Sequence, residues 1–223
     1  MRAWKFSLFI VFLLRFGGAS AQIREGVNPF LMSIRGTATV PHPVTNKAFR
    51  RSFTGIYDAT VSCDYQVFPG AIIGAMYRNN LWKTPDNKIP GLNTYAQSNN
   101  FGLRIGYDFP INETAVGFFG LTAEQGYYHF YGLSINEGTD LTELKTKYAY
   151  HALEGEGGVY FYTEGNFAIG LNASYLFSNF KFNPYRLFLN QHKAYIASDL
   201  NGTVSQLNVG FCVVFSFLKK KKK

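Results

Sequence analysis

The sequence predicts an all-β fold: an eight-stranded antiparallel up-and-down transmembrane β-barrel. The first observation behind this prediction is an alternation of apolar and polar residues with a period of two, which recurs about eight times along the chain. The second is that long polar connections alternate with short ones. Aromatic residues make up 17% of the chain and 22 residues are glycine, a composition that suits strands and tight turns.

The first 21 residues are expected to be a signal peptide. Arg2 and Lys5 give a basic start, residues 6–14 are apolar, and Ala19-Ser20-Ala21 matches a cleavage site. This apolar run is too short for a membrane-spanning helix, which needs about 20 residues. We therefore expect an outer-membrane barrel over residues 22–218 and a periplasmic polylysine tail over residues 219–223.

The formal net charge of +8 is concentrated outside the predicted barrel. Arg2, Lys5 and Arg15 lie in the leader, and five of the remaining basic residues form the run from Lys219 to Lys223. The rest of the chain has 14 basic and 14 acidic residues, so it is neutral. Because nucleic-acid-binding domains carry a basic face on the fold itself, no nucleic-acid partner is expected.

The strands are predicted from the positions of the apolar residues. Every second residue is apolar in 101–109, 167–177 and 207–217, and the same pattern has less contrast in 32–40 and 53–65, where Phe53 and Tyr57 fall on the apolar face. Residues 71–80 are apolar on both faces at first, so their orientation stays open. Residues 115–130 and 147–162 complete the eight. Cys63 falls on the apolar face and Cys212 on the polar one, so two free thiols are expected.

The connections indicate which end of the barrel faces outward. Outer-membrane barrels have short periplasmic turns and longer external loops. A soluble sandwich or lipocalin-like barrel is the alternative, with its apolar face inside. The membrane form is favoured because the apolar strands reach the 9–11 residues that cross a bilayer at a tilt. Long connections are predicted at 41–52, 82–99, 132–146 and 181–201, and short ones around Phe68-Pro69-Gly70, 110–113 and 163–166.

The signal ending in Ala19-Ser20-Ala21, the eight alternating segments and the closing strand from Leu207 to Phe217 together resemble the small outer-membrane barrels of the OmpA and OmpX type. The closing strand resembles the C-terminal signal that the barrel-assembly machinery reads, although Leu218 and five lysines follow the last aromatic residue. The resemblance implies the fold and a location in the cell outer membrane. It implies no activity, because fold does not fix function.

The polar face is expected to form a charge network in the lumen. An eight-stranded barrel is just wide enough to be filled by its own side chains, so a wide porin-like pore is not expected. Buried charges need partners, so arginine–carboxylate pairs across a static interior are the favoured interpretation, with a gate or proton path as the alternative. The sequence shows no plug and no periplasmic domain. The network residues are Arg35, Asp58, Arg104, Asp108, Glu124, Glu154 and Glu156.

No catalytic site, metal site or cofactor is predicted. The four histidines lack metal-ligand spacing and no cysteine lies near them. His129 and His151 fall on neighbouring strands, with Ser174 and Ser178 nearby by topology, and His151 is expected to point outward. A lipid A-modifying enzyme with a His–Ser pair therefore remains an alternative.

The long loops are the expected contact surface. They carry basic residues that could bind lipopolysaccharide phosphates or a protein, and aromatic residues typical of an interfacial girdle. Tyr185, Arg186 and Phe188 are the best partner-binding candidates.

The expected partners are outer-membrane lipids and lipopolysaccharide, the barrel-assembly machinery during insertion, and other envelope proteins. A non-enzymatic structural or accessory barrel is the main hypothesis, and a subunit of a larger secretion or assembly complex is the alternative. The aromatic loop residues are Phe49, Trp82, Tyr95, Tyr185 and Phe188; the basic ones are Lys47, Arg50, Arg51, Lys83, Lys88, Lys181, Arg186 and Lys193.

Overall fold

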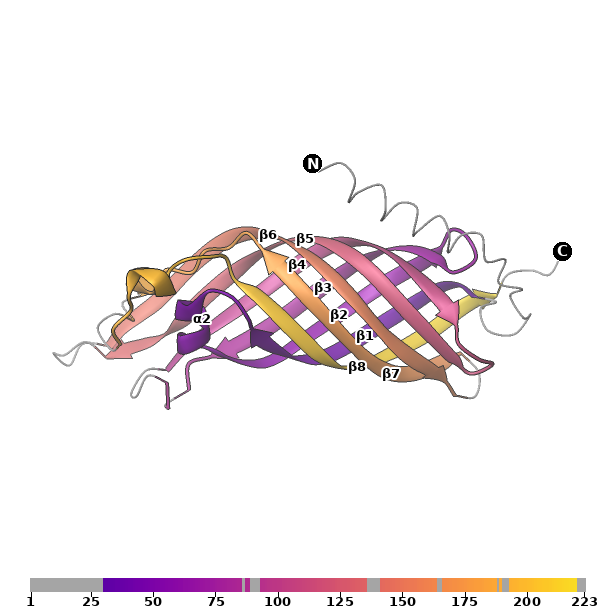
Figure 1. Ribbon diagram of the computed structural model, residues 1–223, viewed down its shortest axis with the longest axis horizontal. Coiled ribbons are helices and arrows are strands. Elements are labelled where there is room, and N and C mark those ends of the chain that lie inside the picture. Colours follow the sequence, from indigo (N-terminus) through magenta and orange to yellow (C-terminus); the bar gives the residue numbers. More distant parts are fainter. Residues whose placement is uncertain are drawn as a thin grey trace, which may run out of the picture.

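The chain forms a closed antiparallel barrel in which each strand pairs with its neighbours in sequence and β1 pairs with β8. Figure 1 shows the strands wrapping around one long axis at a steep tilt. The computed structural model describes residues 30–85, 87–88, 93–135, 141–163, 166–187, 189 and 193–219. The strands are β1 (Phe30–Pro43), β2 (Thr54–Gln66), β3 (Ala71–Lys83), β4 (Asn93–Pro110), β5 (Ala115–Ile135), β6 (Leu141–Tyr162), β7 (Phe167–Ser178) and β8 (Ser205–Lys219). The predicted eight-stranded up-and-down architecture is confirmed.

The two faces of the barrel wall are inverted relative to a soluble barrel. On β4, Phe101 is 69% exposed and Leu103 is 74% exposed, whereas Arg104 is 3% exposed. An apolar exterior around a polar interior suits a lipid environment, and the closed ladder pairs the backbone groups within the wall. Cys63 is exposed and Cys212 is buried, and both are free thiols, as predicted.

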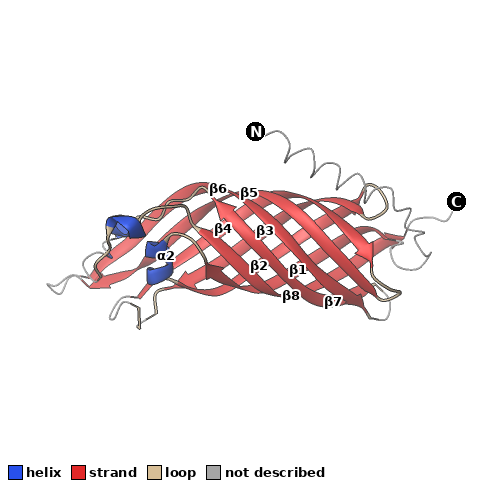
Figure 2. Ribbon diagram, viewed as in Figure 1, coloured by secondary structure: helices blue, strands red, loops and turns tan. Residues whose placement is uncertain are grey.

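Three short turns lie at one end of the barrel and four longer loops at the other, where the helices also lie (Figure 2). The predicted long connections 82–99 and 132–146 were wrong in extent, because β4 begins at Asn93 and β5 and β6 run on to Ile135 and from Leu141. Residues 97–100 of β4 are polar on both faces, so alternation gives no contrast there, yet Ser98 and Asn100 point inside and are fully buried. The four loops are residues 44–53, 84–92, 136–140 and 179–204.

A register shift between Gly55 and Tyr57 ends the simple alternation of β2. Tyr57 is exposed on the outer face, as predicted. Phe53, predicted on the same face, is instead fully buried, because the extra residue at the shift changes which side of the wall the preceding chain faces. Lys219, expected in the tail, is the last residue of β8, and residues 220–223 of the predicted tail and residues 1–21 of the predicted leader lie outside the described residues.

The outer wall carries a polar ladder toward the long-loop end. The Tyr57 hydroxyl donates to Asn79 Oδ1 at 2.6 Å, the Tyr77 hydroxyl donates to Asn99 Oδ1 at 2.8 Å, and Asn79 Nδ2 donates to Asn99 Oδ1 at 2.7 Å. Tyrosines with one wet end are typical of a membrane–water interface. Toward the other end, Tyr107 stacks on a neighbouring aromatic ring, Phe119. Eight residues separate Asn99 from Tyr107, about 27 Å along the strand, which is close to the 9–11 residues with which a tilted strand crosses a bilayer.

The long-loop end contains short helices: α2 (Lys47–Ser52), η1 (Pro184–Leu187) and η3 (Ala197–Asp199). None of the helices in the described residues is long and apolar enough to cross a membrane.

Candidate functional site

The lower interior, near the short turns, is built around Arg35 on β1. Its Nη2 donates to Asp108 Oδ1 on β4 at 3.1 Å, and the Tyr160 hydroxyl on β6 donates to Asp108 Oδ2 at 2.6 Å. The guanidinium carbon lies 4.2 Å from the centre of the Phe118 ring. Charge, hydrogen bonds and an aromatic face therefore surround an arginine that is only 1% exposed.

The middle of the interior is held by Arg104 on β4. Its Nη1 donates to Asp64 Oδ2 on β2 at 2.7 Å, and its Nε lies 2.5 Å from Glu156 Oε1 on β6. Asp64 Oδ2 also lies 3.7 Å from Arg35 Nε. This shared carboxylate connects the lower and middle ion pairs.

The upper part of the charged interior has three carboxylates around one arginine. Arg78 Nη1 donates to Glu124 Oε1 at 2.6 Å, Nη2 donates to Glu154 Oε1 at 2.5 Å, and Nε lies 3.1 Å from Asp58 Oδ1. Asn100 Nδ2 donates to Glu124 Oε2 at 2.8 Å. Four strands are joined at this one guanidinium.

The structure thus places all seven residues of the expected lumen network inside the barrel and groups them around three arginines. Sequence reasoning missed Arg78, because the segment 71–80 could not be oriented from its apolar residues alone. Ile72 and Met76 are buried on the same face of β3 as Arg78, so this face did not have the polar pattern of a lumen face. Asp64 is also missing from the expected network, although it lies on the inner face of β2 and Arg104 needs it as a partner.

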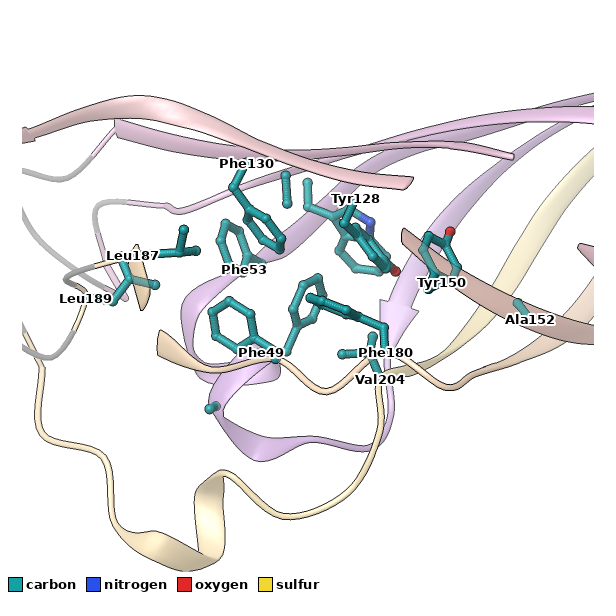
Figure 3. Close-up of a cluster of buried hydrophobic side chains, with 14 of the residues drawn as sticks. Phe49, Phe53, Tyr128, Phe130, Tyr150, Ala152, Phe180, Leu187, Leu189 and Val204 are labelled. Carbon is teal, nitrogen blue, oxygen red and sulfur yellow. The ribbon is translucent and has the colours of Figure 1, made fainter. Parts of the chain in front are cut away.

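The upper interior is filled by a plug of buried apolar side chains, which we call the aromatic plug. Phe49 is its centre: its ring lies 5.3 Å from those of both Trp82 and Phe182 and 5.0 Å from that of Phe53, measured between ring centroids. Figure 3 shows Phe49, Phe53, Tyr128, Phe130, Phe180 and Tyr150 gathered inside the wall. The plug comprises Ala48, Phe49, Phe53, Trp82, Ala96, Tyr128, Phe130, Tyr150, Ala152, Leu176, Phe180, Phe182, Leu187, Leu189, Tyr195 and Val204.

The first and fourth loops add Phe49, Phe53, Phe180 and Phe182 to the inward-facing strand residues of this plug, and the two loops are tied to each other. Asn46 begins α2 with a left-handed backbone (φ 48°), a conformation that asparagine tolerates, and its Oδ1 accepts from Phe49 N at 2.9 Å. Its Nδ2 donates to Gly202 O in the fourth loop at 3.0 Å. At the other end of α2, the Ser52 and Tyr195 hydroxyls share a 2.7 Å hydrogen bond, and Arg51 pairs with Asp199.

Several loop predictions are corrected by the plug. Phe49 and Trp82, expected in an interfacial girdle, are fully buried inside the barrel, and the expectation of no plug was wrong. Leu187 and Leu189 of the fourth loop are buried as well. Phe49, Leu187 and Leu189 are buried because the first and fourth loops fold back into the barrel mouth, where their apolar side chains leave water. Trp82 is buried because β3 extends to Lys83 and places it on the inner face of the wall.

The three predicted partner-contact residues have different surroundings. Tyr185 is 47% exposed, and Arg186 is exposed with its guanidinium carbon 5.8 Å from the centre of the Tyr148 ring. Phe188 lies outside the described residues. Contact with a partner through these residues stays a prediction.

The possible His–Ser pair is not brought together. His151 is exposed on the outer wall, as predicted, whereas Ser174 and Ser178 are buried on the inner face. Their hydroxyls are engaged there: Ser174 Oγ accepts from Asn208 Nδ2 at 3.1 Å, and Ser178 Oγ donates to Val204 O at 2.5 Å. Within the described part of the chain, no group of three or more His, Cys, Asp or Glu residues could hold a metal ion.

Comparison with known proteins identifies the fold. Neisserial surface protein A (NspA) is 14% identical, with a TM-score of 0.53, over 83% of this chain and 97% of that chain. Ail, the attachment invasion locus protein of Yersinia pestis, is 12% identical, with a TM-score of 0.47, over 85% and 100% of the two chains. OprG from Pseudomonas aeruginosa is 13% identical, with a TM-score of 0.45, over 86% and 99%. No protein-family model matches the chain, and no curated protein is significantly similar to it.

The chain therefore has the fold of the small eight-stranded outer-membrane barrels, as its sequence predicted. The inverted faces of the wall agree with that environment. At these identities the likeness concerns the fold and leaves activity to the residues of this chain.

Proposed function

We propose that this protein is a closed, non-enzymatic barrel of the outer membrane that acts through the basic surface of its external loops. The filled interior is the observation that carries the proposal. Ion pairs occupy the lower and middle barrel, the aromatic plug occupies the upper part, and the depressions left among the polar interior residues measure about 10 Å³ each. Such a space holds about one water molecule. A barrel filled in this way supports contact at its outer end better than transport through its centre.

Above the plug, basic side chains from three loops surround the barrel mouth. Lys88 of the second loop donates from Nζ to the carbonyls of Arg50 at 2.9 Å and Phe53 at 2.6 Å. Lys193 of the fourth loop donates from Nζ to the carbonyl of Lys88 at 3.1 Å. We call this surface the basic rim; it consists of Lys47, Arg50, Arg51, Lys88, Arg186 and Lys193.

The basic rim has more positive charge than its own carboxylates neutralise. Burial, and then the nearby Lys193 and Arg50, lower the pKa of the Lys88 ammonium. Burial, and then Arg51, lower the pKa of Lys193 in the same way. Among the described residues of the four loops, Asp199 is the one acidic side chain, and it is paired with Arg51. A surface that holds like charges together in this way is suited to a multivalent anionic ligand.

Binding of a polyanion tests this function. Purified protein in detergent would be titrated with fluorescent dextran sulfate and, as a control, with uncharged dextran of the same length. We expect binding of the sulfated polymer alone, and Lys88→Gln with Lys193→Gln should weaken it by about fivefold for each charge removed. Lys147→Gln, on the wall below the rim, serves as the matched control and should bind normally. Equal binding of both polymers, or no effect of the double variant, would contradict the proposal.

A further inference from the structure

The outer wall has an asymmetric distribution of charge. Six acidic residues of the strands have side chains that the structure describes, and all six point into the barrel. In contrast, Lys83 on β3 and Lys147 on β6 lie on its outer face. Lys147 Nζ lies 4.0 Å from the centre of the Tyr127 ring and Lys83 Nζ lies 5.9 Å from that of Tyr95. Among the described side chains, neither lysine has a carboxylate partner. The acidic residues are Asp58, Asp64, Asp108, Glu124, Glu154 and Glu156.

The strand register collects further polar groups around Lys147. Gln97 on β4 pairs with His129 on β5, which pairs with Lys147 on β6, so the three stand side by side on one face. Residues of this row lie two positions beyond the polar ladder at Asn99, toward the long-loop end of the wall. About 7 Å of strand separates this row from the ladder, so the ammonium of Lys147 stands where lipid head groups lie.

An apolar depression of about 590 Å³ lies on the same wall, nearer the middle of the barrel. Its floor contains the small side chains Ala75 and Ala123, which flank the projecting Leu103 in the strand register. Its edge toward the loops is formed by Gln125 and His151, which pair across β5 and β6. The depression is therefore apolar in the band of the membrane and polar at its outer edge.

We propose that this face binds one molecule of phosphorylated lipid A from the outer leaflet. An acyl chain occupies the depression beside Leu103, and a phosphate group is held by Lys147 and His129, with Lys83 on the neighbouring side. Charge complementarity selects an anionic head group, because no described acidic side chain of the strands lies on the outer face, where it would repel a phosphate. Ala123 pairs with Leu153, six positions along β6 from Lys147. This is about 20 Å of strand, so one lipid with a charged head group and an apolar tail can reach both places. The inference rests on the outer-membrane location in the proposed function and not on the basic rim.

The experiment measures lipid retention by native mass spectrometry. Full-length mature protein would be released from detergent micelles that contain bisphosphorylated lipid A, its dephosphorylated form or phosphatidylglycerol. We expect one bisphosphorylated lipid A per barrel and much less of the other two. Lys147→Gln with Lys83→Gln should reduce retention by about fivefold per charge, whereas Lys147→Arg with Lys83→Arg, which keeps both charges, should not.

A second pair of variants tests the depression. Ala123→Leu fills the floor and should reduce retention of the phosphorylated and dephosphorylated lipids alike, whereas Ala38→Leu, also outward but on β1, should change neither. Circular dichroism would establish that each variant forms the barrel. Retention that is equal for all three lipids, or that neither set of variants changes, would overturn the proposal. Loss of dextran sulfate binding in rim variants would leave this result untouched, so the two proposals fail separately.

Discussion

Ser52 and Tyr195 share a hydrogen bond of 2.7 Å between their hydroxyl oxygens, although 143 residues separate them in sequence. The bond joins the end of α2 in the first loop to the fourth loop. Together with the bond from Asn46 to Gly202, it makes the two loops one unit. The aromatic plug is therefore a packed core inside the barrel mouth, and its loss should be measurable as a loss of stability.

Removal of the central ring of the plug tests this packing. Phe49→Ala should lower the free energy of unfolding by about 3–5 kcal/mol, because it opens a cavity among fully buried rings. Trp82 reports on it directly: it is the one tryptophan beyond the predicted leader, and its ring lies 5.3 Å from that of Phe49. Iodide should quench its fluorescence weakly in the wild type and strongly in the variant. Phe101→Ala, which removes a ring from the outer wall, is the matched control, and equal quenching in all three proteins would refute a sealed plug.

The three carboxylates around Arg78 predict a pH-dependent variant. Arg78→Met leaves Asp58, Glu124 and Glu154 buried without their cation and should destabilise the barrel by about 3–5 kcal/mol at neutral pH. Acid protonates the carboxylates and removes their mutual repulsion, so the deficit should shrink as the pH falls. Urea unfolding of both proteins at several pH values would measure this. A deficit that stays constant or grows in acid would show that the arginine has another role.

The turn between β2 and β3 depends on Gly70. Its φ of 81° favours glycine, and an added Cβ would lie 2.6 Å from the carbonyl oxygen of Asp108. Gly70→Ala should therefore destabilise the barrel by at least about 1–2 kcal/mol. At Gly155, the nearest atom to an added Cβ is a Leu121 methyl at 3.7 Å, so Gly155→Ala should be close to neutral in the same unfolding assay. A neutral Gly70 variant would mean that this turn relaxes at little cost.

The two cysteines test the assignment of the wall faces. Cys63 is exposed on the outer wall, whereas Cys212 is 1% exposed among the apolar residues of the lower interior. After transfer of the protein into a small-micelle detergent at alkaline pH, where a thiol on the outer wall can ionise, maleimide should label Cys63 in the folded protein and should reach Cys212 only after unfolding. Mass spectrometry of the labelled peptides gives both rates. Rapid labelling of Cys212 in the folded protein would indicate an accessible lumen.

The strands of the barrel wall and their two faces were predictable from sequence, because the alternation of apolar and polar residues is a pattern among neighbouring residues. Alternation at Phe101, Leu103 and Arg104 fixes which side faces lipid, and that side is confirmed. The predicted ends of the strands were less accurate, because residues 97–100 near the start of β4 are polar on both faces. The same alternation identified most charged residues of the interior. It failed for Arg78, because β3 has apolar side chains on both faces.

The plug could not be predicted from local pattern. A phenylalanine in a polar loop, such as Phe49, has the same sequence signature whether it lies at a membrane interface or folds into the barrel mouth. Its position depends on partners that are distant in sequence, among them Trp82 and Phe182. The basic rim depends on the same packing, since Lys88 is held by carbonyls that α2 presents only when the plug is formed.

Conductance across a planar lipid bilayer tests the closed barrel most directly. Mature protein would be reconstituted and its single-channel current recorded in concentrated salt, with Phe49→Ala alongside. The filled interior predicts no steady ion current from the wild type and openings, if any, from the variant alone. A stable, reproducible current through the wild-type barrel would contradict the account, because it would show a continuous aqueous path past both the ion pairs and the aromatic plug.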